Sequence, residues 1–269
     1  MTASIRRAAA VLLLGLPCAV IAQAPPPPPQ PLGSPPVPAA NALSSAKIQL
    51  GQALFWDEQL SLTGTVACGT CHRPASGGSD PRTASGTAAA THPGADGVFG
   101  TADDVRGSAG VAAHAADGLY HAAGFFGVAP QVTSRKSPAV VNAAYAPQLF
   151  WDGRAGGSFS DPATGQVLIP VGGALETQSL VPLLNPAEMA HQGEAAADLA
   201  ARVAALHPLD LADSVPAALQ SWIAGRAYPA LFQEAFGSAG VSAARIALAL
   251  ASYERTLSAN QAPIDSEFG

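Results

Sequence analysis

The chain has 269 residues, of which 12% are charged, and 13 Lys and Arg against 19 Asp and Glu give a formal net charge of −6. The acidic balance excludes the basic footprint of a nucleic-acid-binding protein, and the composition excludes a disordered polyelectrolyte. The 27 glycines and 24 prolines indicate long loops, while three cysteines are too few for a disulfide scaffold.

Residues 1–24 have the pattern of a secretory signal peptide. Two arginines precede an apolar run over 8–21, and the segment ends in Ala22-Gln23-Ala24. The run is shorter than the ~20 apolar residues that a membrane-spanning helix needs. We therefore expect cleavage near residue 24, loss of Cys18 with the signal peptide, no membrane span, and export to the periplasm.

Residues 25–44 are predicted to form a Pro-rich linker, because nine of the fourteen residues from Pro25 to Pro38 are proline. Such a segment favours polyproline II structure and acts as a spacer. The alternative is a ligand for a proline-recognising domain. The folded domain is then expected over 45–269.

The folded part is predicted to be all-α with long irregular loops. No stretch alternates with the period of two that is typical of half-buried strands, whereas apolar residues recur at helical spacing. A serine followed by proline at 137–138 commonly begins a helix. Thirteen glycines between Gly64 and Gly127 indicate a long irregular loop, and such loops are usually functional or disordered. Helices are expected over 45–56, 137–145, 195–206, 216–223 and 242–257.

The first turn of that loop contains Cys68-Gly69-Thr70-Cys71-His72, the C-x-x-C-H pattern of covalent c-type haem attachment. The two thiols add to the two vinyl groups of haem, and the adjacent histidine becomes the proximal iron ligand. The alternatives are a thioredoxin-like redox pair, which needs a strand–helix context, and structural zinc, which needs four ligands. The sequence supplies neither, and it therefore predicts one covalently bound c-type haem on Cys68, Cys71 and His72.

Further motifs follow in a fixed order along the chain. Together they span about residues 47–264, and through them the chain resembles the bacterial di-haem cytochrome c peroxidase and MauG family. They are Leu50-Gly51-Gln52-Ala53-Leu54-Phe55-Trp56-Asp57, Ser137-Pro138, Asn142-Ala143, Phe150-Trp151-Asp152-Gly153-Arg154-Ala155, Leu175-Glu176, Gln178, Glu188-Met189 and Tyr253-Glu254-Arg255-Thr256-Leu257.

The resemblance implies a cytochrome c-like haem domain of the peroxidase type, which reduces hydrogen peroxide to water. Electrons would come from a small donor protein, a cytochrome c or a cupredoxin. The matched positions are those of the N-terminal, peroxide-binding haem domain. The alternatives are a mono-haem electron-transfer cytochrome c, an inactive haem-binding fragment, and MauG-like oxidation of a protein partner.

The resemblance also implies roles for individual residues. Glu188 would move a proton between the two peroxide oxygens, and Gln178 would share the distal pocket with it. One positioned carboxylate suits that task, because cleavage of the O–O bond needs one oxygen deprotonated and the other protonated. Trp151 would relay electrons, unless it is a core side chain. Arg154 would bind a haem propionate or pair with Asp152.

Glu188 also has a structural alternative, as an acid in the first turn of a helix, where the helix dipole favours negative charge.

Three departures from the family pattern matter. Gly269 ends the sequence where the family continues into a second haem domain, so we expect a truncated product; the alternatives are that the second haem domain is lost or lies on another chain. Val128 stands where many relatives have a distal histidine, which leaves a five-coordinate haem or His121 as the distal ligand. Lys136 stands where the family often has an asparagine that helps to bind calcium, and calcium is therefore disfavoured at that site.

Residues 96–104 form another calcium candidate, since clustered carboxylates and glycine turns suit a hard cation. The leading acid of a full D-x-D-G loop is missing, because Gly94 takes its place. A solvated acidic turn is therefore expected here instead of a calcium site.

Overall fold

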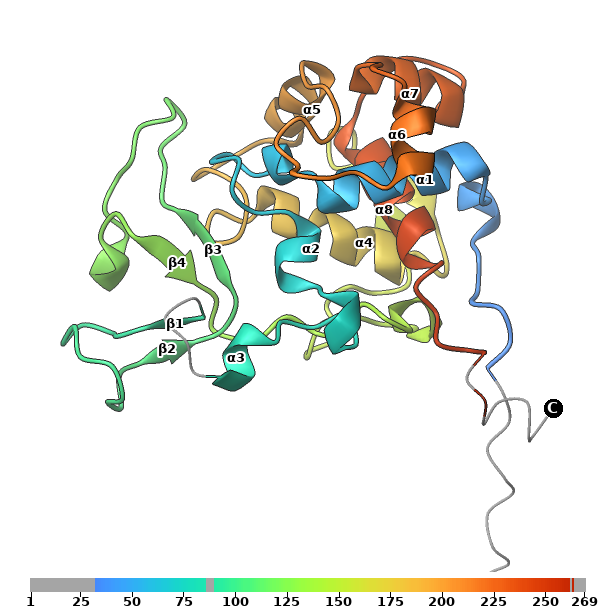
Figure 1. Cartoon of the computed structure of the whole chain (residues 1–269). Helices are drawn as coiled ribbons and strands as arrows, with labels where there is room; N and C mark the ends of the chain where they lie inside the picture. The colour runs from blue at the N-terminus through green and yellow to red at the C-terminus, as the bar shows by residue number, and fades with distance from the viewer. Residues whose placement is uncertain (1–31, 86–89, 262, 264–269) are drawn as a thin grey trace, which may run out of the picture.

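The computed structural model describes residues 32–85, 90–261 and 263. The expected signal peptide and the first part of the expected linker lie outside these residues. Helices dominate the described part, together with three two-stranded sheets (Figure 1). The prediction of a mainly helical domain is confirmed, but the small sheets depart from a strictly all-α fold. In the described ranges no helix is long and apolar enough to cross a membrane.

Helices α1 (Ser45–Trp56) and α8 (Ala243–Glu254) pack against each other at the centre of the domain (Figure 1). Each begins after a serine whose hydroxyl oxygen accepts the backbone N–H three residues further on. Both helices were expected from local periodicity and are confirmed, α1 with the predicted bounds. Leu50 and Leu54 of α1 and Ile246 and Leu250 of α8 are fully buried in one apolar core.

Four further helices surround this pair. α4 (Ala174–Leu180) packs on α8, and α7 (Tyr228–Phe236) packs on α1. α5 (Ala196–Ala204) and α6 (Ala217–Ile223) correspond to two of the expected helices and are confirmed. α4 and α7 are not among the helices predicted from the sequence, although the proline in the first turn of α7 is a common helix start signal.

The described end of the expected linker is anchored on the helical body. The carbonyl oxygen of Pro36 accepts a hydrogen bond from Arg255 Nε at 3.1 Å. Asn41, in the short 3₁₀ turn η1 (Ala39–Asn41), is fully buried and donates to Glu176 Oε1 at 2.9 Å. Arg255 also donates to both carboxylate oxygens of Glu176, at 2.8 and 3.0 Å. A buried ion pair therefore joins α4 to the end of α8, and hydrogen bonds with both of its members hold the start of the described chain.

The helix expected over 137–145 is wrong, since only η5 (Ala143–Tyr145) is helical there. Ser137 does not cap a helix, because its hydroxyl donates to the carbonyl of Cys71 at 2.7 Å. The N–H of Val140 donates to the carbonyl of Gly78 at 3.0 Å. Long-range hydrogen bonds thus hold this segment across the Cys68–His72 turn, and they override the local helix signal.

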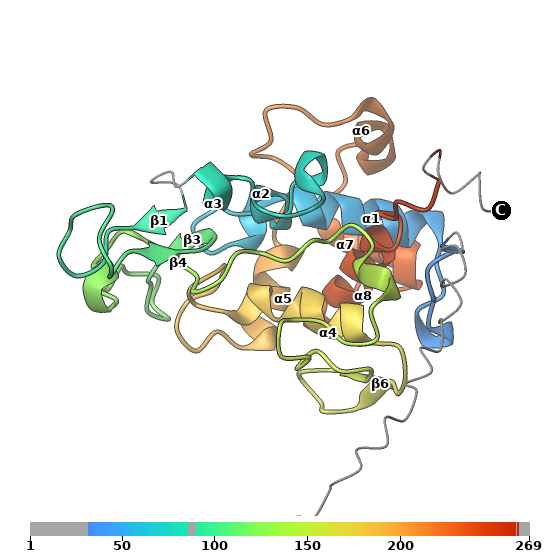
Figure 2. The same ribbon diagram turned by 90° about the horizontal axis from the view of Figure 1, so that it is seen from below.

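The glycine-rich region is more ordered than the sequence predicts. It contains two four-residue helices, α2 (Cys68–Cys71) and α3 (Arg82–Ser85), and short strands. The strands pair as two antiparallel ribbons that project to one side of the helical body (Figures 1 and 2). The third pair lies beside α4. The strands are β1 (Thr91–His92) with β2 (Val105–Arg106), β3 (Ala109–Ala112) with β4 (Pro130–Val132), and β5 (Phe159–Ser160) with β6 (Val167–Ile169).

Candidate functional site

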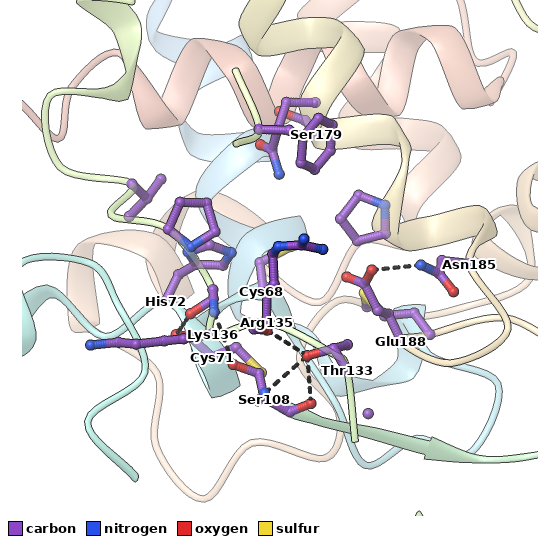
Figure 3. A pocket seen from close by; sticks show the side chains of 18 of the residues that line it. Cys68, Cys71, His72, Ser108, Thr133, Arg135, Lys136, Ser179, Asn185 and Glu188 are labelled. Carbon is purple, nitrogen blue, oxygen red and sulfur yellow. Dashed lines mark hydrogen bonds between the residues drawn. The ribbon is translucent and has the colours of Figure 1, made fainter. Parts of the chain in front are cut away.

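A cavity of about 390 Å³ lies between α2, α4, β3 and the extended segment before η5 (Figure 3). Its size falls in the range of small-molecule and cofactor sites. The structure brings seven of the eight predicted site residues to its walls, from segments far apart in the sequence. These residues are Cys68, Cys71, His72, Trp151, Arg154, Gln178 and Glu188.

A backbone hydrogen bond orients the ring of His72. Its Nδ1 lies 3.0 Å from the carbonyl oxygen of Gly78, and because a carbonyl only accepts, Nδ1 carries the proton. Burial lowers the pKa of His72, against the opposing effects of the Gly78 and Pro138 carbonyls and of Asp80. Burial therefore favours the neutral imidazole, in which Nε2 is the unprotonated nitrogen, the form in which histidine binds a metal.

Gly78 is required at its position for two reasons. Its φ of +76° lies in the left-handed region, and a Cβ there would come within 2.5 Å of Val140 Cγ1. The same carbonyl that orients His72 also accepts the N–H of Val140. Gly78 thus links the histidine to the segment that crosses α2.

The two cysteines are free thiols one helical turn apart, and both line the cavity. Burial raises the pKa of both thiols, and most strongly that of Cys68. A thioredoxin-like pair needs the opposite shift, toward a reactive thiolate, so this alternative is not supported. Structural zinc is not supported either, because the described residues contain no group of three or more His, Cys, Asp and Glu that could hold a metal ion.

The cavity fits a c-type haem in its donor set and in its charge. The two thiols stand beside His72, as covalent attachment requires. Three cationic side chains, of Arg135, Lys136 and Arg154, line the cavity and could pair with the two haem propionates. Apolar side chains complete the walls, among them Val66, Pro138, Val140, Leu149, Phe150 and Met189.

Glu188 is held in place by its neighbour Asn185, whose Nδ2 donates to Oε1 at 2.6 Å (Figure 3). Asn185 is itself fixed, because its Oδ1 accepts the N–H of Ala187 at 2.9 Å. Burial raises the pKa of Glu188, while the Asn185 amide and the positive charge of Arg154 act in the opposite direction. Glu188 lies in a turn outside any helix, so the alternative role as a first-turn helix acid is not supported.

Gly110 on β3 lets the Glu188 turn approach the cavity wall. A Cβ on Gly110 would come within 1.9 Å of the Ala187 carbonyl oxygen and 2.8 Å of Glu188 Cα. The sequence gives one weak signal for this role, a glycine inside a short apolar stretch, which often marks a close backbone approach.

Arg154 and Trp151 lie at the rim of the cavity. Arg154 Nη1 is 3.0 Å from Asp152 Oδ1, and its guanidinium stacks 3.7 Å from the centre of the Phe150 ring. Of the two expectations for Arg154, the pairing with Asp152 is therefore present, and the side chain also borders the cavity. Trp151 is 70% exposed and stacks with Arg135 at 4.1 Å, so it is not a core side chain.

His121 is not brought to the cavity. Its side chain is exposed, and its backbone N–H donates to the carbonyl of Ala113. His114 is buried elsewhere, with Nδ1 2.7 Å from the carbonyl oxygen of Ala112. Within the described ranges His72 is the only histidine that lines the cavity.

The acidic turn at 96–104 uses its carboxylates to satisfy its own backbone. Asp103 Oδ2 accepts the N–H groups of Ala95 and Asp96 at 2.8 and 3.1 Å, and Asp104 Oδ2 accepts that of Gly100 at 2.9 Å. Two carboxylates thus hold the turn together, while Asp104 Oδ1 is buried and has no hydrogen-bond partner among the described residues.

Two buried residues of the cavity wall, Glu254 at the end of α8 and Ser179 on α4, have no role predicted from the sequence. The Ser179 hydroxyl donates to Glu254 Oε1 at 3.4 Å. Glu254 belongs to the motif at 253–257 of the family resemblance, but its place on the cavity wall results from the packing of α4 on α8.

Comparisons with known proteins give a consistent result. Residues 45–268 match the family model described as "Di-haem cytochrome c peroxidase". The chain is 29% identical over 230 residues to the methylamine utilization protein MauG of Methylophilus methylotrophus, with 86% of this chain and 45% of that protein aligned. It is 30% identical over 233 residues to MauG of Methylorubrum extorquens, with 86% and 44% aligned.

The chain thus spans less than half the length of these two curated relatives. A crystal structure of a MauG-like protein associated with microbial copper homeostasis aligns with 89% of this chain and 48% of that chain, at 23% identity and a TM-score of 0.47. Since the family model covers nearly the whole folded part, from α1 past the end of α8, the chain belongs to the di-haem cytochrome c peroxidase family.

Proposed function

We propose that this chain is a periplasmic c-type haem protein that reduces hydrogen peroxide to water. The observation that carries the proposal is the placement of Glu188, fixed by Asn185, in the same cavity as His72 and the two cysteines. Cys68, Cys71 and His72 would hold one haem, which when bound supplies the redox-active iron for cleavage of the O–O bond. Family membership supports the same chemistry.

The reaction consumes one peroxide, two electrons and two protons and yields two waters. Glu188 Oε2 would take the proton of one peroxide oxygen and return it to the other. The raised pKa of Glu188 suits this exchange, because a carboxylate that binds its proton more tightly is a stronger base toward peroxide. Gln178, from α4, would orient the peroxide through its side-chain amide.

The electrons would come from a small donor protein, a cytochrome c or a cupredoxin, and Trp151 would pass them inward. The exposure of Trp151 at the cavity rim supports contact with such a partner. Arg154 and Arg135, which stack on the neighbouring aromatic rings, would hold the haem propionates. Calcium is not part of the proposal.

Oxidation of a protein partner is a second candidate function. The specific observation is again Trp151, which lines the cavity and is also exposed at the surface. The similarity of the chain to two MauG proteins supports the same candidate. Under this function the electrons would leave a partner protein through Trp151 after the reaction with peroxide, and no small donor would be required.

The proposed organisation is a signal peptide at 1–24, a Pro-rich linker at 25–44 and a haem domain at 45–269. A second haem domain, either further along a longer chain or on another chain, belongs to the proposal, because the family is di-haem and this sequence contains one C-x-x-C-H motif. Fractionation of expressing cells tests the location: the processed, haem-containing protein is expected in the periplasmic fraction.

Peroxide-dependent oxidation of a reduced cytochrome c or cupredoxin by the haem-loaded protein tests the function. Activity is expected for the wild type, with a loss of about 10²–10⁴-fold in Glu188→Gln. Glu234→Gln, on α7 outside the cavity, is the matched control and should retain activity. In Trp151→Phe, slow donor oxidation with normal reaction toward peroxide is expected. Equal activity in Glu188→Gln and Glu234→Gln would argue against the proposed role of the carboxylate.

A further inference from the structure

Glu254 is a buried carboxyl on the wall of the haem cavity, and only one of its two oxygens has a partner among the described residues. The residue is 5% exposed, at the last position of α8. Oε1 accepts the Ser179 hydroxyl at 3.4 Å, whereas Oε2 is buried and has no hydrogen-bond partner within the part of the chain that the structure describes. An ionised carboxylate in that position would be poorly stabilised.

The charges around Glu254 do not compensate for this burial. α2 contributes the Cys68 thiol, α4 contributes Ser179 and the negative Glu176, and Arg255 follows directly after α8. The guanidinium of Arg255 is already bound to both oxygens of Glu176, so its charge is largely neutralised. Burial raises the pKa of Glu254 to about 8, with Glu176 adding to the effect and Ser179 and Arg255 opposing it.

We propose that Glu254 is a redox-linked proton-binding residue of this cavity. Glu254 Oε2 binds one proton from solvent when the haem attached at Cys68 and Cys71 gains one electron, and it releases that proton when the electron leaves. The electron comes from a one-electron donor, the proton comes from water, and the O–H bond is the only bond formed. The proposal rests on the haem binding in the proposed function, but it does not depend on peroxide reduction.

The physical basis is charge balance in a medium of low dielectric constant. An added electron makes the cavity more negative, which further disfavours an ionised carboxylate on its wall and raises its proton affinity. A proton stored on Glu254 would arrive together with an electron. Peroxide reduction needs equal numbers of both, so Glu254 would supply protons to the cavity while Glu188 moves them at the substrate.

The experiment is a potentiometric titration of the haem-loaded protein, followed by haem absorbance, between pH 5.5 and 9.5. For the wild type the midpoint potential is expected to fall as pH rises around pH 8. The slope should approach about 59 mV per pH unit, which corresponds to a tenfold change in the equilibrium constant of a one-electron couple. In Glu254→Gln the slope around pH 8 should disappear, whereas Glu234→Gln, on α7 outside the cavity, should keep it. An unchanged slope in Glu254→Gln overturns the proposal.

Ser179→Ala provides a second, independent variant. Loss of the hydroxyl donor removes a hydrogen bond that favours the ionised form, so the pH range of the slope should move upward. If Glu254→Gln fails to retain haem, the Ser179→Ala variant tests the proposal by itself. The proposal is then overturned if the midpoint potential of Ser179→Ala varies over the same pH range as that of the wild type. Absence of covalent haem from the wild-type protein would overturn the proposed function as well. If haem is bound but both variants show the same pH dependence of the midpoint potential as the wild type, only the role of Glu254 is overturned.

Discussion

The carbonyl oxygen of Gly78 lies 3.0 Å from Nδ1 of His72, and it also accepts the N–H of Val140 at 3.0 Å. One acceptor thus joins the expected haem ligand to the segment that crosses α2. Groups that hydrogen-bond a ligand histidine set its tautomer and ring orientation. The geometry at His72 therefore depends on a backbone conformation that only glycine adopts easily.

Gly78→Ala is expected to disturb the haem ligand, and Gly77→Ala provides a matched control. Both glycines have positive φ, +76° and +67°, but a Cβ at Gly77 meets nothing within 4 Å. We expect Gly78→Ala to destabilise the haem-loaded protein by about 1–3 kcal/mol more than Gly77→Ala, because only the former forces Val140 away. Urea unfolding followed by haem absorbance measures both. Equal destabilisation would mean that the contact with Val140 is unimportant.

Substitutions at Asn185 should move the pH dependence of peroxide turnover. The Asn185 amide donor lowers the pKa of Glu188, so Asn185→Ala should raise it. If turnover requires the Glu188 carboxylate as base, the acid limb of kcat/KM moves to higher pH. Asn185→Asp keeps an acceptor for the Ala187 N–H but places a second negative charge beside Glu188 where the amide donor was. The acid limb of kcat/KM should therefore move furthest to higher pH in this variant. A limb that stays in place or moves to lower pH contradicts this role.

The buried Arg255–Glu176 pair is expected to matter far more for stability than the exposed Arg226–Glu234 pair. The side chains of the first pair are 2% and 0% exposed, those of the second 33% and 43%. Glu176→Gln leaves a buried guanidinium without its counter-charge and should lower the free energy of unfolding by about 3–5 kcal/mol. Glu234→Gln should change it by less than about 1 kcal/mol. Urea denaturation of the two variants, side by side, checks the difference, and comparable values would refute it.

Features fixed by neighbouring residues could be predicted from the sequence. α1 and α8 follow from apolar periodicity and from serine caps, both of which are local. The C-x-x-C-H motif places two thiols and an imidazole together within five residues, and the structure directs all three to one cavity. Glu188 and Gln178 were indicated through the family resemblance, and they line the same cavity.

Features that depend on distant partners could not be predicted in this way. Ser137 followed by proline is a good local helix start, but hydrogen bonds to Cys71 and Gly78 hold the segment extended. The cavity position of Glu254 follows from the packing of α8 on α4, and no pattern around residue 254 signals a buried carboxyl. His121 is the nearest histidine in sequence to Val128, the position where many relatives have a distal histidine. It lies between β3 and β4 and does not line the cavity.

The most direct test of the central claim is the reaction of the oxidised, haem-loaded protein with hydrogen peroxide, followed by stopped-flow absorption. His72 is the only histidine on the described cavity wall, so an open, high-spin spectrum is expected before mixing. Addition of peroxide should then change the spectrum rapidly, with a rate that rises with peroxide concentration and falls by about 10²–10⁴-fold in Glu188→Gln. A low-spin spectrum that peroxide leaves unchanged, even after addition of a reductant, would contradict the peroxidase assignment and favour an electron-transfer cytochrome.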